Sequence, residues 1–436
     1  MAKLAVFAAL VALLWSPVHA EPWRPPVTRA MVDAEFAKFD ARHPALKAER
    51  AAKLRPLADR LLALQAKGEP LFCSAQMLNE LRWLLDATTQ WSRIDRQLWL
   101  LGVSMEDEDQ AFAIGQEAYD GSWGICYDEW FKKLDPMIQA IDAMAGKGVA
   151  PEYSQLQFLQ PIGSPEQLIA YLNRVRISDI ANTGLDRREE LGAVSTVVAE
   201  IVFKQQVEEY LAKRVQGIEL DPGYVEAFRR YTDDWQDPET GFWGPWYMID
   251  GKLLKAADLS FTYHIVAYRR GDVPDWSKII ATLLAIRDEE YPFGWRFHGR
   301  MNNHNAYDVI RLMKLGWPHM DAAQQAETAV AIEDLVRTSL RDSLSPEGVF
   351  AADPEFSSSV ADAQYYGVSV LTEAGYCSTE PPFWKAGGWP DAGPTCCRIA
   401  SSLRAANQSI PAMAAALHRL EKHYPGCAEA TAAGSG

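Results

Sequence analysis

The chain has 436 residues, of which 48% are hydrophobic, and its formal net charge is −15. This acidic balance argues against nucleic-acid binding, which depends on neutralising phosphates, and it requires a local basic pocket in any site for an anionic substrate. The length suits one large domain or two ordinary ones.

The chain begins with a predicted export signal, residues 1–20. Lys3 gives a positive start, the run from Leu4 to Trp15 is almost wholly apolar, and residues 18–20 fit a small-x-small cleavage site. The run is short for a membrane span, and no later segment approaches that length. We therefore expect cleavage, no stable membrane insertion, and a protein in the periplasm or outside the cell. We also expect a monomer.

Gly-containing loops then recur at intervals of about 55 residues, centred on Gly184, Gly241, Gly294 and Gly348. Each loop has helix-like sequence on both sides, as expected for helical hairpins that bury their faces by stacking. We predict about five to six hairpins in a single domain, residues 21–426, followed by a disordered tail, residues 427–436. The long aromatic loops favour an (α/α) toroid over an open solenoid.

Capping residues mark several helix starts. Ser164 precedes a proline and a glutamine in the first turn, and Asp275 and Asp321 begin further helices. Strand signals are sparse, because the turn-like pairs Asp120-Gly121 and Asp250-Gly251 are flanked by segments that do not alternate cleanly. The sequence therefore predicts an all-α fold.

The six cysteines are even in number, which in an oxidising compartment permits disulfides. Proximity in sequence favours pairing Cys73 with Cys126, and Cys377 with either Cys396 or Cys397. The chain has no CxxC pair, no HExxH or nucleotide-binding motif, and no close i, i+4 histidine pairs. We expect neither a metal nor a cofactor.

Tryptophans cluster in or beside the Gly loops, among them Trp243, Trp246 and Trp295. A cleft lined by aromatic faces suits the C–H groups of sugar rings, and large core residues are the alternative interpretation.

The densest polar segment spans residues 295–308, just before an apolar helix. It contains two Arg, two His, three Asn and a Tyr within about a dozen residues. One Asn, at 302 or 303, is explained as a helix N-cap. The rest suits β-elimination of a uronate polymer, in which one group neutralises the carboxylate, a base removes the C5 proton and an acid protonates O4. Arg296 and Arg300 would bind neighbouring carboxylates as planar forks.

The segment Asn302-Asn303-His304-Asn305 resembles the Asn-Asn-His segment of (α/α)-toroid alginate lyases. The resemblance implies that Asn303 and His304 serve the carboxylate and the proton transfer, and that a tyrosine on a later inner helix completes the site. Tyr365, or its neighbour Tyr366, lies at a comparable separation. The chain departs from the family after the histidine, where an aromatic-Trp pair is expected, and it has no Arg just before Tyr365.

Two other functions fit the sequence. A glycoside hydrolase needs two carboxylates flanking the glycosidic bond, and Asp258 and Asp362 each open an expected inner helix. Tyr263 and His264 could serve as base and acid, or be buried structural residues. A non-catalytic glycan-binding protein with an aromatic groove is the third possibility.

We predict an exported polysaccharide lyase that cleaves a uronate-containing glycan. Its predicted catalytic residues are His304, Asn303 and Tyr365. The predicted substrate-binding residues are Arg296, Arg300, Trp243, Trp246, Trp295, Tyr263, His264, Tyr366, Asp258 and Asp362.

Overall fold

A computed structural model describes residues 28–42, 120–123, 129–352, 360–406 and 411–427, together with a few single positions between these ranges. This part of the chain is mostly helical, which confirms the predicted all-α class. None of its helices is both long and apolar enough to cross a membrane. The predicted signal peptide, the proposed Cys73–Cys126 pair and nearly all of the predicted tail lie outside the described residues.

Several connections between the α-helices are long, such as residues 286–302 and 374–391, and others contain short helical turns. Four 3-10 turns are described, η2 (Trp130–Lys133), η3 (Gln157–Ile162), η4 (Trp317–His319) and η6 (Pro425–Cys427), and the π-helical turn η5 (Ser339–Ser343) continues α15. In chain order the described α-helices are α2 (Arg29–Arg42), α6 (Leu134–Lys147), α7 (Pro165–Val175), α8 (Ile180–Thr183), α9 (Arg188–Phe203), α10 (Gln205–Arg214), α11 (Pro222–Trp235), α12 (Leu259–Tyr268), α13 (Trp276–Ala285), α14 (Asn303–Gly316), α15 (Ala322–Thr338), α16 (Val360–Glu373), α17 (Ala392–Ala405) and α18 (Pro411–His423).

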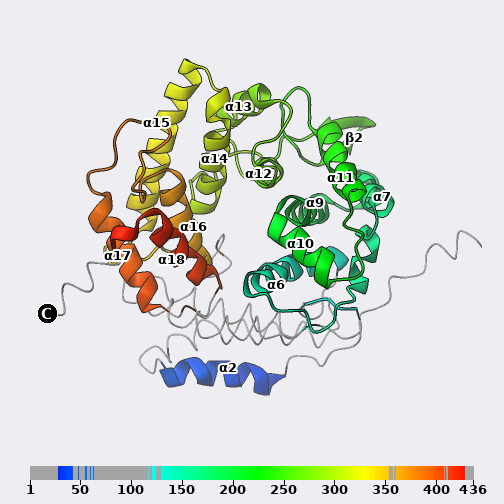
Figure 1. Ribbon diagram of the computed structural model, residues 1–436, viewed down its shortest axis with the longest axis horizontal. Coiled ribbons are helices and arrows are strands. Elements are labelled where there is room, and N and C mark those ends of the chain that lie inside the picture. The colour runs from blue at the N-terminus through cyan, green and yellow to red at the C-terminus, as the bar shows by residue number, and fades with distance from the viewer. Residues whose placement is uncertain are drawn as a thin grey trace, which may run out of the picture.

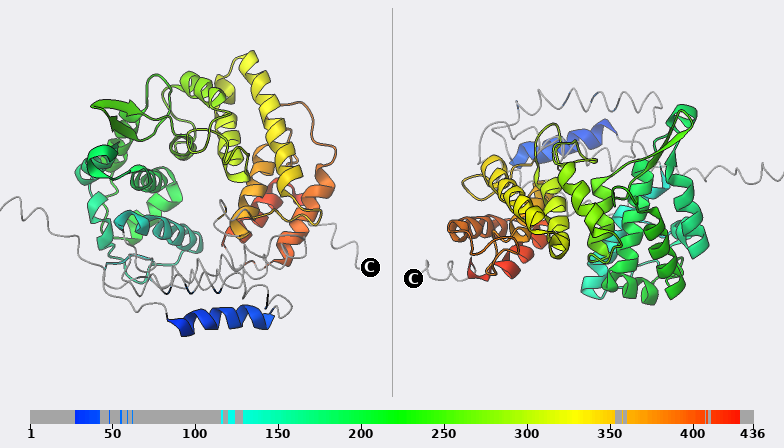
Figure 2. Two further views of the ribbon diagram at one scale, coloured as in Figure 1. Left: turned by 180° about the vertical axis from the view of Figure 1, so that it is seen from behind. Right: turned by 90° about the horizontal axis from the view of Figure 1, so that it is seen from above.

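Most of the helices from α7 onward form an inner and an outer row. Helix α9 packs against α12, α12 against α14, α14 against α16, and α16 against α18. Figure 1 shows this inner row facing the middle of the molecule, with α7, α11, α13, α15 and α17 on the outside. The view from behind in Figure 2 shows the same arc of helices. The starts of successive inner helices are therefore brought close together, although they are far apart in the sequence.

The capping residues explain where these helices begin. Ser164 accepts a hydrogen bond from the backbone N–H of Gln167, and Asp275 accepts one from Lys278. Asp321 forms a reciprocal capping box with Gln324. An N-cap of this kind stabilises a helix by roughly 1 kcal/mol. All three predicted helix starts are confirmed.

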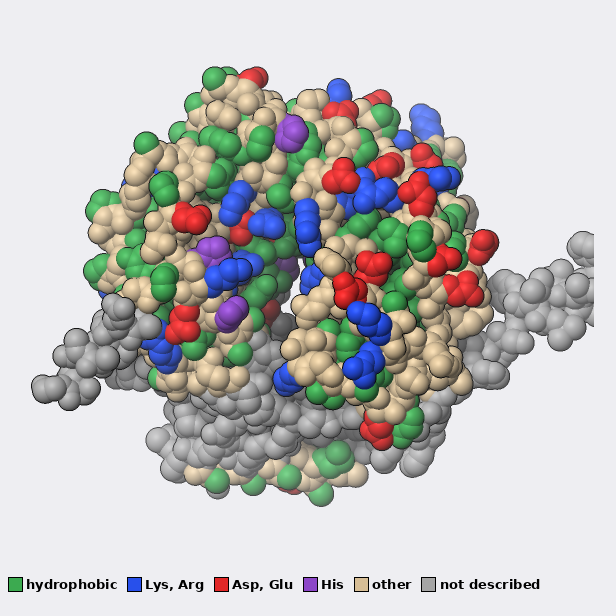
Figure 3. Space-filling view, in the orientation of Figure 1, with side chains coloured by type: hydrophobic (Ala, Val, Ile, Leu, Met, Phe, Trp, Pro, Cys, Tyr) green, Lys and Arg blue, Asp and Glu red, His purple; other side chains and the backbone are tan. Residues whose placement is uncertain are grey.

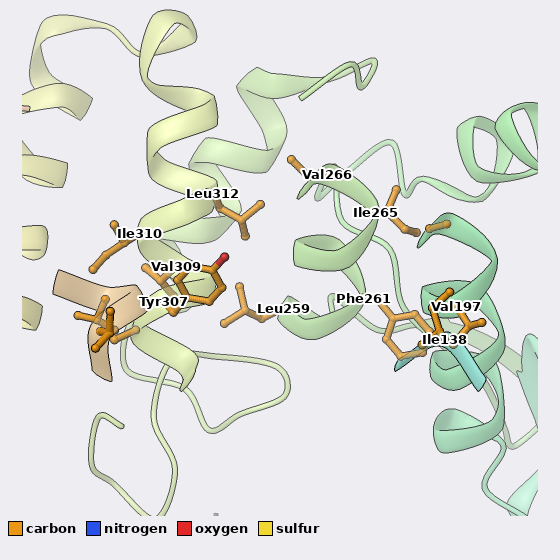
Figure 4. Close-up of a cluster of buried hydrophobic side chains, with 14 of the residues drawn as sticks. Ile138, Val197, Leu259, Phe261, Ile265, Val266, Tyr307, Val309, Ile310 and Leu312 are labelled. Carbon is orange, nitrogen blue, oxygen red and sulfur yellow. The ribbon is translucent and has the colours of Figure 1, made fainter. Parts of the chain in front are cut away.

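Helix α12 is buried between two other inner helices. Figure 4 shows Phe261 directed toward Val197 and Ile138, while Leu259 lies on the side of Tyr307 and α14. Leu259 is fully buried and Phe261 is 3% exposed. Packing on both sides holds α12 firmly in the row and fixes its spacing from α14.

The repeated loops are closed by tryptophans. The indole N–H of Trp243 donates to the carbonyl of Thr232, and that of Trp295 donates to the carbonyl of Leu283 at 3.0 Å. In each case the acceptor lies in the last turns of the helix that precedes the loop. Because the buried indole donates a hydrogen bond to this carbonyl, it fixes the direction in which the chain leaves the helix.

Two of the loop glycines are required by close backbone approach. Gly241 has φ +72° and Gly348 has φ +84°, a conformation that favours glycine. A Cβ atom would lie 2.6 Å from the backbone of Ile279 at Gly241, and equally close to the backbone of Arg398 at Gly348. These two loops therefore press against the outer helices α13 and α17, whereas at Gly184 a Cβ atom would meet nothing within 4 Å.

A small sheet corrects the prediction at Asp250-Gly251. Strands β2 (Trp246–Ile249) and β3 (Lys252–Lys255) form an antiparallel hairpin, and β1 (Ile177–Ser178) pairs with β2 in parallel. Asp250 and Gly251 both have positive φ, as a two-residue hairpin turn requires. Strand β3 is exposed along its length and β2 is mostly half-buried, so neither strand alternates between buried and exposed residues, and sequence alternation missed the hairpin.

Two disulfides tie the last helices together. Cys377 is bonded to Cys396, which confirms one of the two predicted pairings, and Cys397 is bonded to Cys427. Disulfides persist in oxidising compartments. The adjacent cysteines at the start of α17 thus anchor this helix to the end of α16 on one side and to η6 on the other.

Replacing both Cys377 and Cys396 by alanine is expected to lower the free energy of unfolding by about 3 kcal/mol. The reason is that the bond closes a loop of 19 residues and restricts the unfolded chain. Urea unfolding followed by circular dichroism measures the loss. A change below about 0.5 kcal/mol, the size of a neutral surface substitution, would contradict this role.

Candidate active site

A cavity of about 760 Å³ opens at the N-terminal end of α14, and we call it the α14 cavity. Its walls come from the loop before α14, the first turn of α14, the end of α15 with η5, and α16. A hollow of about 840 Å³ over α6 and α10 is larger, but no predicted site residue lines it. The predicted residues that line the α14 cavity are Arg300, Asn303, His304, Asp362 and Tyr366.

His304 and Tyr366 form the centre of this site. Their rings are stacked, with centroids 4.1 Å apart and planes inclined by 12°. His304 comes from the first turn of α14 and Tyr366 from the second turn of α16, and these two helices pack side by side. The side chain of His304 keeps 27% of its surface exposed. An imidazole and a phenol are thus held together at the edge of one cavity.

Two asparagine amides lie beside them. Asn302 caps α14 by accepting a hydrogen bond from the N–H of Asn305, and its Nδ2 is buried without a hydrogen-bond partner in the described part of the chain. Asn303 Nδ2 donates to Ser343 Oγ at 3.0 Å, which fixes it against η5. The cap therefore accounts for the side-chain oxygen of Asn302 but not for its buried amide nitrogen.

Burial sets the protonation of the two rings. It lowers the pKa of His304 to about 4, and it raises the pKa of Tyr366 well above its ordinary value, with Asp362 and Asp308 adding to the increase. At neutral pH the imidazole is neutral and can accept a proton, while the phenol keeps its proton and can donate it. The site thus holds one potential base and one potential acid.

Asp308 lies directly behind His304. It is fully buried, and its Oδ2 is 3.8 Å from His304 Nε2, one helical turn along α14. From the sequence, Asp308 was only one of several candidate carboxylates for a hydrolase, and it was not paired with His304, although the i, i+4 spacing on a helix places both side chains on one face. Burial raises the pKa of its carboxyl well above the ordinary range.

The two predicted arginines are separated. Arg300 lines the α14 cavity. Arg296 forms an ion pair with Asp288 and lines a smaller neighbouring hollow of about 200 Å³. Only Arg300 is therefore placed to bind a carboxylate in the α14 cavity.

Tyr365 lies on a different side of α16 from the α14 cavity. Its ring is 5.3 Å from that of Tyr366, and the Arg419 guanidinium lies 5.8 Å from its centroid. Tyr365 does not line the cavity, because adjacent residues on a helix point about 100° apart. The choice of Tyr365 over Tyr366 is corrected by this geometry.

The predicted aromatic binding residues lie elsewhere. Trp243 is fully buried and Trp295 is 1% exposed, so neither ring offers a face to a bound sugar. Trp246 lies in the hairpin, with the Arg176 guanidinium 4.1 Å from its ring centroid. These tryptophans support loops and strands, in keeping with the alternative interpretation of the sequence, in which they are large core residues.

Tyr263 and His264 are half-buried on α12. The Tyr263 ring packs 5.7 Å from that of Tyr307. The Nδ1 atom of His264 is buried without a hydrogen-bond partner in the described structure, and burial lowers the pKa of this histidine to about 3. Neither residue lines the α14 cavity.

The carboxylates proposed for hydrolysis are not equivalent. Asp362 lines the α14 cavity, whereas Asp258 is fully buried and forms an ion pair with Arg188, with Nε and Oδ2 2.7 Å apart. Asp258 also caps α12 through the N–H of Phe261. A carboxylate held in this way is structural, and it does not face Asp362 across the cavity.

Comparison with protein families, with curated proteins and with solved structures finds no match to this chain. Within the described residues, no three His, Cys, Asp or Glu side chains are grouped to hold a metal ion.

Proposed function

We propose that this protein is an exported polysaccharide lyase, in which the arc of helical hairpins closes into an (α/α) toroid and the α14 cavity cleaves a uronate-containing glycan. The observation that carries the proposal is the meeting of His304, Tyr366 and two asparagine amides around one cavity. Each group has the chemical character that β-elimination requires.

The reaction assigns one task to each group. Asn303 donates a hydrogen bond to the uronate carboxylate, which stabilises the charge that develops when C5 loses its proton. Asn302 holds the start of α14 through its cap. His304 removes that proton, because its lowered pKa keeps the imidazole neutral. The electron pair forms the C4=C5 double bond, the C4–O4 bond breaks, and Tyr366 gives its proton to O4.

The charge distribution supports an anionic substrate. The chain as a whole carries a net charge of −15, so an anionic polymer needs a basic approach. Arg300 supplies a cation at the α14 cavity. Figure 3 also shows Lys and Arg side chains gathered around the hollow in the middle of the molecule, on the face drawn there.

Incubating the purified protein with a panel of uronate polymers tests the proposal. A lyase produces a new ultraviolet absorbance from the unsaturated product. New reducing ends without that absorbance would indicate a hydrolase, and binding without either product would indicate a glycan-binding protein. Both of these outcomes would overturn the lyase assignment.

Replacing Tyr366 by phenylalanine is expected to lower kcat by about a hundredfold, because the variant keeps the ring stacked on His304 but loses the acid that protonates O4. Steady-state rates of double-bond formation on a responsive polymer measure the effect. Tyr365→Phe is the matched control, since it removes a hydroxyl from the neighbouring residue outside the α14 cavity. Equal losses in the two variants would contradict the assignment of Tyr366.

A further inference from the structure

Asp308 is a buried carboxyl that the elimination itself does not use. It is 0% exposed, and neither carboxyl oxygen has a hydrogen-bond partner within the described part of the chain. A buried polar group without a partner is costly, so each such group in a folded protein calls for an explanation, and a catalytic role is one of them. The polar atom that approaches it is Nε2 of His304, at 3.8 Å.

Three phenols face Asp308, and a second imidazole, that of His264 on α12, interacts electrostatically with His304. Tyr263 comes from α12, Tyr291 from the loop before α14, and Tyr366 from α16, and the carboxyl of Asp308 helps to raise the pKa of each. A phenol with a raised pKa remains uncharged at neutral pH. His304 is therefore the group in this set that can take up a positive charge beside Asp308.

We propose that Asp308 is a positioning residue that holds His304 through Nε2 and determines when His304 can accept a proton from the substrate. The catalytic part of this inference rests on the proposed lyase function, whereas the coupling between the two side chains does not.

The chemistry follows from the tautomers of imidazole. An ionised Asp308 favours the tautomer with the proton on Nε2, in which Nδ1 carries the lone pair that accepts a proton. It also stabilises the imidazolium that forms when His304 accepts the C5 proton. The separation of 3.8 Å exceeds a hydrogen bond, and we expect it to shorten when that charge appears.

The same geometry gives a pH dependence with a definite sign. When Asp308 is protonated, His304 loses its anionic partner and is a weak base, because burial alone lowers its pKa to about 4. Activity should therefore rise with pH as Asp308 loses its proton. Since burial raises the pKa of this carboxyl, the rise should lie above the ordinary range for aspartate.

Nuclear magnetic resonance of the folded protein tests the coupling without an activity assay. The ring resonances of His304 are followed against pH in the wild type, in Asp308→Asn and in Asp258→Asn. In the wild type we expect a step at the pH where Asp308 titrates. Asp308→Asn should lose that step, and Asp258→Asn, which alters a buried carboxyl already paired with Arg188, should keep it.

An identical His304 curve in the wild type and in Asp308→Asn would overturn the proposal. If Asp308→Asn does not fold, the carboxyl carbon of Asp308 in the labelled wild-type protein decides instead. The chemical shifts of that carbon and of the His304 ring must then change at the same pH. If they change at different pH values, the coupling is overturned as well.

The lyase assay then separates the two proposals. With a responsive polymer, Asp308→Asn is expected to lower kcat at least about tenfold with little change in KM, and to remove the rise of kcat with pH. Loss of the His304 step together with an unchanged pH profile would overturn the catalytic role of Asp308. If no polymer responds but the His304 step is lost in the variant, the coupling stands and the proposed function fails.

Discussion

Replacing His304 by alanine is expected to lower kcat for β-elimination by about 10²- to 10⁴-fold, the contribution typical of a positioned general base. The imidazole is the group at the α14 cavity that is neutral at neutral pH and therefore able to take the C5 proton. KM should change little, because Asn303 and Arg300 still bind the carboxylates. The measurement is the rate of unsaturated-product formation at saturating polymer.

The control for this variant is His319→Ala. His319 lies in η4 on the outer surface, where its ring stacks on Trp276 at 5.4 Å, far from the α14 cavity in the fold. Removing it should leave the rate near that of the wild type. Thermal unfolding of both variants shows whether His304→Ala keeps its fold, and near-normal turnover by a folded His304→Ala would remove the histidine from the mechanism.

Local signals in the sequence predicted the helices well. Asp275 and Asp321 cap α13 and α15 because an Asp side chain reaches the free N–H groups of the first turn whatever lies around it. The loop glycines were also visible, since Gly241 and Gly348 lie where a Cβ atom would meet backbone. In contrast, the hairpin of β2 and β3 is set by its turn at Asp250-Gly251, and its strands left no alternating pattern to detect.

The candidate site was predicted in part. The Asn-His segment lines the α14 cavity. The sequence could indicate this because the polar run comes directly before the apolar stripe of α14, which places it at the start of that helix. The choice between Tyr365 and Tyr366 depended on the rotation of α16 about its axis. Adjacent residues on a helix differ by about 100°, and only the packing of α16 against α14 fixes which of them meets His304.

The role of the tryptophans could not be predicted from the sequence, because an indole suits both a sugar-binding surface and a buried core. Composition and spacing are the same in the two cases. What decides is whether the N–H finds a carbonyl inside the protein, as it does for Trp243 and Trp295. These two residues therefore belong to the framework that positions the inner helices around the α14 cavity.

Replacing Trp295 by alanine is accordingly expected to lower the free energy of unfolding by about 3–5 kcal/mol. The variant leaves a large cavity where a ring that is 1% exposed was packed, and it removes the hydrogen bond to the carbonyl of Leu283. The backbone carbonyl of residue 295, which accepts from Asn305 Nδ2, remains in the variant. Urea unfolding followed by circular dichroism measures the loss.

Trp246→Ala is the matched comparison, because this half-buried ring in the hairpin mainly contacts the cations of Arg176 and Lys255. Its loss should cost only about 1 kcal/mol, as for exposed cation–π contacts. A Trp295→Ala protein with unchanged stability but weakened glycan binding would instead restore Trp295 to the substrate site. The difference between these outcomes follows from burial, since a side chain with no exposed face can affect a polymer only through the fold it supports.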